Sequence, residues 1–272
     1  MKYIYTGAST AMKAFETYEG NDELSQLVSI GKLFQVYSGY KMTDVSHYGR
    51  PNLWLAEQVR LQRLAPLHDE GTTPVVWLYS DCIQQQFWRA RQRMFPQVPR
   101  EHRDTVWSLI TSTDWQAEHS AIADRELREL NQLGNPIAFV GSSGDIYPEQ
   151  VAEYENLTVL EPSWKRVIGE HAGIPFEGRY VLVELLHNAI NEFFPHPDYK
   201  WNELWRADRQ WYDKHKQLNQ QLVDRIFEVY KWRADMEQAG YMTGTHPNVY
   251  SNVIYHNHIK QRVKEWIDAN TQ

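Results

Sequence analysis

The chain has 272 residues and a formal net charge of −7, from 28 basic and 35 acidic side chains. This balance argues against a general nucleic-acid binder, which needs a basic stripe for phosphates. The single cysteine, Cys82, excludes an intramolecular disulfide. No apolar run has the length of a signal-peptide core or of a membrane span. We therefore expect a globular, cytoplasmic protein that does not bind membranes.

Five short runs have the composition of strands. They are residues 3–6, 33–38, 74–80, 136–142 and 157–160. The third and fourth are almost continuously apolar, which is typical of strands covered on both faces. Apolar residues at helical spacing lie between the runs, at residues 53–64 and 115–133. This alternation predicts an α/β fold, with a flavodoxin-like parallel five-stranded sheet and helices on both faces in three layers.

The second half of the chain is mostly helical in pattern. Helical spacing covers residues 180–194, 202–238 and 250–269. No linker or internal repeat separates these segments from the first half. We therefore expect one domain over residues 1–272, with a helical insertion at about residues 163–240. The tryptophans of the long helix favour either an oligomer or assembly surface, or a cap over the core.

Two side chains at opposite ends of the sequence suggest a reactive site. The first strand ends in Gly7-Ala8-Ser9-Thr10, and in a parallel sheet ligands bind at the carboxyl ends of strands. A helix after Ser9 would direct N–H groups at a developing oxyanion, although Ser9 is also typical of a helix cap. His246 precedes the last helix, where an imidazole that titrates near neutrality suits a general base. The alternative is a merely exposed histidine.

The order of these motifs resembles the SGNH (GDSL-like) hydrolases. That family has Gly-x-Ser after the first strand, a glycine block after the second, Gly-x-Asn-Asp after the third, and a final Asp-x-x-His. The corresponding segments here are Gly7-Ala8-Ser9, Gly49-Arg50-Pro51-Asn52, Leu78-Tyr79-Ser80-Asp81, and Thr243-Gly244-Thr245-His246 followed by Pro247. The chain departs from the family at Ser80, which replaces the asparagine, and at Thr243, which replaces the aspartate. Residues 162–240 are largely uncovered by the resemblance.

The resemblance implies roles for particular residues. Ser9 would be the nucleophile and His246 its base, without metal or organic cofactor. The oxyanion hole would use the N–H groups of Ser9 and Gly49 and the hydroxyl of Ser80. A backbone carbonyl, Asp81 or Asp145 would replace the missing carboxylate.

Four residues are expected on the rim of the site: Asn52, Asp81, Ser142 and Trp164. For Trp164, a packed aromatic at the rim is at least an equal alternative to the wall of a pocket. His256 and His258 are two positions apart, so they do not share a helix face and do not predict a metal pair.

Three functions fit these residues. The first is a serine hydrolase of esterase or O-deacetylase type, acting on a small-molecule or carbohydrate ester. The second is a non-enzymatic structural or assembly protein, such as a component of a phage particle, located in the host cytoplasm or the virion. The third is a transferase that uses the same pair of side chains. Ser9, Gly49 and His246 favour an enzyme, whereas Leu78, Ser80 and Thr243 favour the assembly protein.

Overall fold

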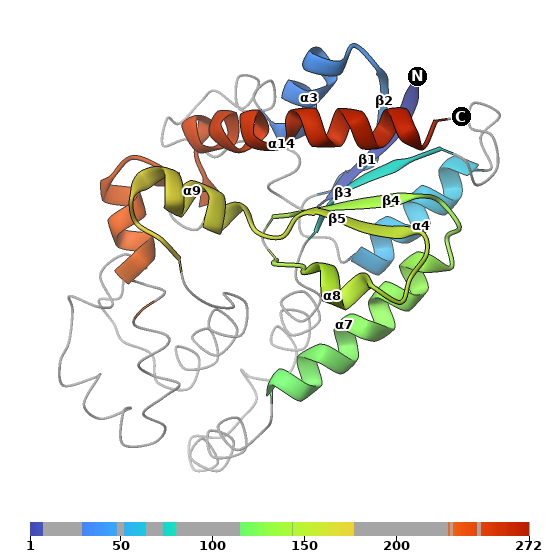
Figure 1. Cartoon of the computed structure of the whole chain (residues 1–272), viewed down its shortest axis with the longest axis horizontal. Helices are drawn as coiled ribbons and strands as arrows, with labels where there is room; N and C mark the ends of the chain where they lie inside the picture. The colour runs from blue at the N-terminus through green and yellow to red at the C-terminus, as the bar shows by residue number, and fades with distance from the viewer. Residues whose placement is uncertain are drawn as a thin grey trace, which may run out of the picture.

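The computed structural model describes residues 1–7, 29–47, 52–63, 73–79, 115–142, 144–176, 228, 231–243 and 246–271 (Figure 1). A five-stranded, all-parallel sheet forms the centre, in the order β2-β1-β3-β4-β5. The strands are β1 (Lys2–Gly7), β2 (Lys41–Asp44), β3 (Val75–Tyr79), β4 (Ile137–Gly141) and β5 (Leu157–Glu161). This is the flavodoxin-like order. The predicted fold class is confirmed.

Helices cover both faces of the sheet (Figure 1). One face packs against α3 (Ile30–Ser38), α9 (Trp164–Ala172) and α14 (Val249–Ala269). The other packs against α4 (Asn52–Arg63) and α7 (Trp115–Asn131), while the short α8 (Pro148–Val151) lies beside β5. Successive strand residues point to opposite faces: Tyr3 and Tyr5 contact the α14 side, and Ile4 contacts the α4 side.

The strand predicted at residues 33–38 is wrong, because this segment belongs to helix α3. Ser29 caps its start, with Oγ accepting a hydrogen bond from the Lys32 N–H at 3.3 Å. Gly39 ends it with a positive φ of 68°. The caps override the β-forming composition of the run, and the second strand follows at Lys41–Asp44.

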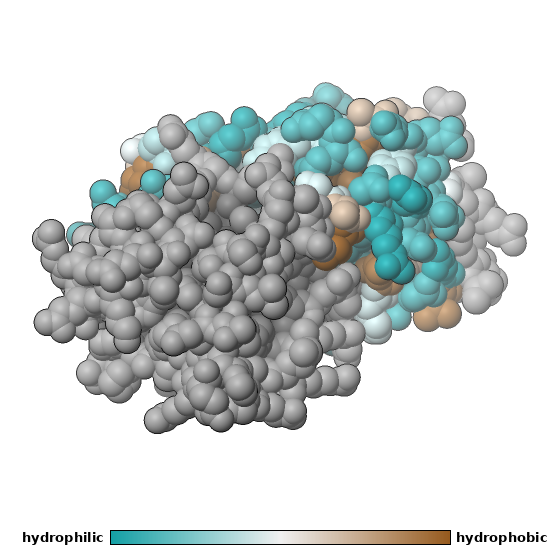
Figure 2. All heavy atoms as spheres, turned by 90° about the horizontal axis from the view of Figure 1, so that it is seen from below, coloured by the Kyte–Doolittle hydropathy of each residue, from teal (hydrophilic) through white to brown (hydrophobic). Residues whose placement is uncertain are grey.

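The other described elements agree closely with the sequence. Helices α4, α7 and α14 match the patterns at residues 53–64, 115–133 and 250–269. The predicted helix at 180–194 and most of that at 202–238 lie outside the described residues, although 231–238 is helical. Within the described ranges, no helix has the length and apolarity to cross a bilayer. The face in Figure 2 is mainly hydrophilic where it is described, with small separate apolar patches.

Helix α14 runs back along the sheet, antiparallel to the strands. Near its start, the Tyr255 hydroxyl donates to the Gly141 carbonyl at the end of β4. Near its end, Asp268 accepts a hydrogen bond from Tyr40, just before β2. The N-terminus of α14 therefore lies at the end of the sheet where the strands terminate, which we call the carboxyl edge. The opposite end is the amino edge.

Candidate functional site

The three expected oxyanion-hole positions follow residues that are neighbours in the structure. The Gly7 carbonyl at the end of β1 accepts a hydrogen bond from the His47 N–H at 3.1 Å. On its other side, Gly7 is the ladder partner of Leu78 in β3. Ser9, Gly49 and Ser80 each come two residues after one of these three. Ser9, Gly49 and Ser80 are therefore each only two residues along the chain from the same point on the carboxyl edge.

The segment that carries His246 lies at the same edge. A hairpin of β6 (Met242–Thr243) and β7 (His246–Pro247) immediately precedes α14. Thr243 is the ladder partner of His246 across this hairpin. Ser9, Gly49, Ser80, Asp81 and the side chain of His246 lie outside the described residues, so their contacts stay predictions.

Two of the expected rim residues are packed inside the protein. Asn52 is fully buried: its Oδ1 accepts from Trp77 Nε1 at 3.1 Å, and its Nδ2 donates to Glu126 Oε1 at 2.5 Å. These bonds hold α4 against β3 and α7. Trp164 belongs to the core on the α14 face, so it is packed more deeply than either the pocket wall or the packed rim position considered for it.

Ser142 does lie at the carboxyl edge, in the loop after β4. It is buried, and its N–H donates to the Tyr79 carbonyl at 3.2 Å, as does the Gly144 N–H. The loop after β4 is thus held against the last residue of β3. Because Ser80 follows Tyr79 directly, the loop borders the expected oxyanion hole.

The same loop carries one member of a buried ion pair. Asp145 Oδ1 lies 3.8 Å from Lys165 Nζ, and the two side chains are only 5% and 1% exposed. In the described structure, neither carboxylate oxygen of Asp145 has a hydrogen-bond partner. Attraction across such a distance compensates poorly for the loss of hydration of the Asp145 carboxylate.

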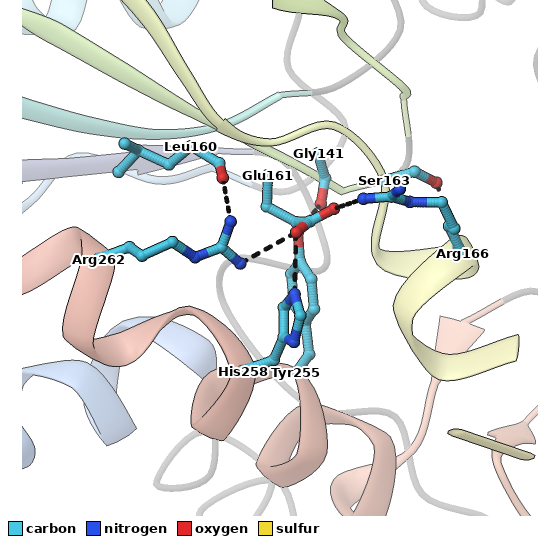
Figure 3. Close-up of polar contacts among 8 residues, drawn as sticks. All are labelled: Gly141, Leu160, Glu161, Ser163, Arg166, Tyr255, His258 and Arg262. Atoms are coloured by element: carbon cyan, nitrogen blue, oxygen red, sulfur yellow. Dashed lines mark hydrogen bonds and ion pairs between the residues drawn. The ribbon is translucent and has the colours of Figure 1, made fainter. Parts of the chain in front are cut away.

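A second buried carboxylate, Glu161 at the end of β5, is surrounded by hydrogen-bond donors (Figure 3). It accepts bonds from Arg166 Nη2 at 2.9 Å, His258 Nε2 at 2.9 Å and Arg262 Nη2 at 3.0 Å. Burial by itself raises the pKa of Glu161, but these donors favour the ionised form and hold the pKa below its ordinary value. We call Glu161, Arg166, His258 and Arg262 the Glu161 cluster.

The Glu161 cluster fixes two helices to the end of β5. Arg166 comes from the first turn of α9, whereas His258 and Arg262 are one turn apart on α14 (Figure 3). Arg262 also donates to the Leu160 carbonyl at 2.6 Å. Together with the Tyr255–Gly141 bond, these contacts anchor the N-terminal half of α14, and hence the start of the helix that follows the His246 hairpin.

The sequence reasoning missed the Glu161 cluster, although part of its signal was present. His258 and Arg262 have the four-residue spacing of one helix face, and Glu161 directly follows the strand predicted at residues 157–160.

The two histidines of α14 face different surroundings, as the sequence predicted. His258 contacts Glu161, whereas His256 is buried beside the ring of Tyr37, at 6.0 Å between centroids. Burial, with a smaller contribution from nearby Lys260, lowers the pKa of His256 to about 4. Among the described residues, no group of three or more histidine, cysteine or acidic side chains could hold a metal ion.

No family model matches the chain, and comparison with curated proteins and with solved structures gave no match.

Proposed function

We propose that this protein is a serine ester hydrolase with Ser9 as nucleophile and His246 as general base. The observation that supports the proposal is the convergence at Gly7. Its hydrogen bond to His47 and its ladder contact with Leu78 bring together the segments that lead to Ser9, Gly49 and Ser80. The hairpin with His246 begins from the same edge of the sheet.

The reaction follows the usual logic of a serine nucleophile. Ser9 Oγ attacks the acyl carbon of the ester while His246 accepts the hydroxyl proton. The N–H groups of Ser9 and Gly49 and the Ser80 hydroxyl stabilise the oxyanion. His246 returns the proton to the departing alcohol, which leaves an acyl-serine. Water then attacks the acyl carbon while His246 takes its proton. As the bond from the acyl carbon to Ser9 Oγ breaks, His246 passes this proton to Oγ, which releases the carboxylic acid and restores the serine hydroxyl.

One observation favours the second candidate, a non-enzymatic assembly protein on the same fold. Thr243 occupies the place of the family's aspartate and is the ladder partner of His246 in the hairpin. A threonine cannot orient the imidazole as a carboxylate does, and in serine proteases an amide in place of that carboxylate lowers the rate about 10⁴-fold. The enzyme therefore needs another acceptor for the ring.

Labelling with a fluorophosphonate separates the two functions. We expect the native protein to be labelled and to hydrolyse 4-nitrophenyl acetate, and Ser9→Ala to do neither. Ser38→Ala is the matched control, because Ser38 ends α3 at the amino edge; it should be labelled like the native protein. A native protein that is neither labelled nor active on short acyl esters would overturn the hydrolase proposal and favour the assembly protein.

A further inference from the structure

Three rings form a surface cluster at the base of the His246 hairpin. They are His171 at the end of α9, Tyr241 before β6 and Tyr250 at the start of α14. The ring centroids of Tyr241 and Tyr250 are 5.4 Å apart, and His171 lies 5.9 Å from Tyr241 and 6.4 Å from Tyr250. We call these three residues the ring cluster. Tyr250 is 53% exposed and His171 is also exposed, so the cluster faces solvent.

The backbone beneath the ring cluster is firmly held. The Tyr241 carbonyl accepts hydrogen bonds from the Asn248 N–H at 3.3 Å and from the Ser251 hydroxyl. Asn248 also donates through its side chain to the Gly240 carbonyl at 2.6 Å and caps α14. These contacts close the hairpin between the two tyrosines. A ligand would therefore meet aromatic rings that are already in place, with little conformational entropy to lose.

The chemistry of the ring cluster fits a neutral sugar. Tyrosine rings offer an apolar face with a polar hydroxyl at the rim, which matches a pyranose with its C–H face and its ring of hydroxyls. Tyr241 Oη and His171 Nδ1 lie 3.3 Å apart, so the polar atoms also gather at one place.

The charged residues nearest to His171 and Tyr241 along the sequence disfavour an anionic ligand. The nearest charged residues in the chain, Glu170 beside His171 and Glu237 before Tyr241, are both acidic. A nucleic acid would stack on such rings equally well but needs basic residues for its phosphates.

We propose that the ring cluster binds the carbohydrate part of the ester substrate. Tyr250 lies four residues after His246 in the sequence. A sugar ring stacked on Tyr250 would carry its acyl group near the hairpin that contains His246. The inference rests on the proposed hydrolase function for its biological meaning, but binding itself does not depend on Ser9.

Titration calorimetry on the Ser9→Ala protein tests the proposal without turnover. The probe is triacetylchitotriose, a neutral trisaccharide with acyl groups. We expect Tyr250→Ala to weaken binding about 5- to 10-fold, the contribution of a well-stacked aromatic contact, and Tyr250→Phe to keep most of the affinity because the ring remains. Tyr37→Ala is the matched control: Tyr37 is 39% exposed on α3, away from the hairpin, and its loss should leave the affinity unchanged.

The outcomes separate the two proposals. No binding of the trisaccharide, or equal affinity in Tyr250→Ala and the Ser9→Ala parent, overturns the carbohydrate surface even if fluorophosphonate labelling succeeds. Tight binding of a short oligothymidylate, lost in Tyr250→Ala, would assign the rings to nucleic acid and overturn it as well. Sugar binding that depends on Tyr250 in a protein without labelling retains the surface and removes only the hydrolase.

Discussion

Two buried carboxylates lie at the carboxyl edge, Glu161 at the end of β5 and Asp145 in the loop after β4. Glu161 accepts three hydrogen bonds, from Arg166, His258 and Arg262. In the described structure, Lys165 Nζ lies 3.8 Å from Asp145 Oδ1, and the Asp145 oxygens accept no hydrogen bond. Both carboxylates are therefore buried, but only the charge of Glu161 is stabilised by hydrogen bonds from described side chains.

The comparison shows that burial alone does not tell whether a charge stabilises the fold. The donors around Glu161 are 42–52% exposed, so they keep part of their hydration while they bind the carboxylate. Lys165 and Asp145 are both buried and lose their hydration. The first arrangement stabilises the contact between β5 and two helices, whereas Asp145 gains no hydrogen bond among the described residues in return for its lost hydration. Substitutions should therefore act differently at the two places.

The largest effect is expected from Lys165→Met. The substitution leaves Asp145 buried without its cation, which should lower the free energy of unfolding by about 3–5 kcal/mol. Urea denaturation at pH 7 measures the change. Lys32→Met, at an exposed position on α3, is the control and should change stability by no more than about 0.5 kcal/mol. A loss at Lys165 as small as that of the control would mean that Asp145 is well solvated.

A smaller effect is expected from Glu161→Gln. The partners left behind, Arg166 and Arg262, are half-exposed and can hydrate, so the loss should be about 2 kcal/mol at pH 7. Because the pKa of Glu161 is held below its ordinary value of 4.5, its contribution is present above that pH and is lost as pH falls through the folded-state pKa. The difference in stability between the native protein and Glu161→Gln should therefore shrink below pH 4.5.

The exposed residue Glu153 supplies the comparison for this pH dependence. Glu153→Gln should show no difference from the native protein at either pH. If Glu161→Gln differs from the native protein equally at pH 7 and pH 3.5, the ionised form of Glu161 is not what stabilises the cluster.

The sheet could be predicted more fully than the site. The apolar runs that became β3 and β4 were located to within a residue or so at each end, because strands buried on both faces have few alternatives. The run at 33–38 was misassigned, since its structure depends on two flanking residues, Ser29 and Gly39, rather than on its own composition. In this segment the helix caps outweighed the strand propensity of the residues between them.

The site depends on contacts between residues far apart in the sequence. Glu161 and His258 are separated by 97 positions, and they meet only because α14 packs across the end of β5. The sequence indicated Asp145 as an acid near the site, but nothing in the pattern marked Lys165 as its buried neighbour. The spacing of residues in the sequence shows which of them share a helix face, but it does not show which distant residues that face contacts in the folded protein.

The smallest effect is expected when Asp145 and Lys165 are changed together. Asp145→Asn combined with Lys165→Met removes both charges, and buried ion pairs replaced by uncharged residues of similar volume are often neutral in stability or better. The double variant should unfold within about 1 kcal/mol of the native protein, which makes the two single substitutions strongly non-additive. A double variant as unstable as Lys165→Met alone would show that Lys165 acts through packing rather than charge. A double variant that keeps its stability but reacts more slowly with the fluorophosphonate would mean that the pair serves the chemistry at the carboxyl edge, where a buried charge changes the pKa of neighbouring groups.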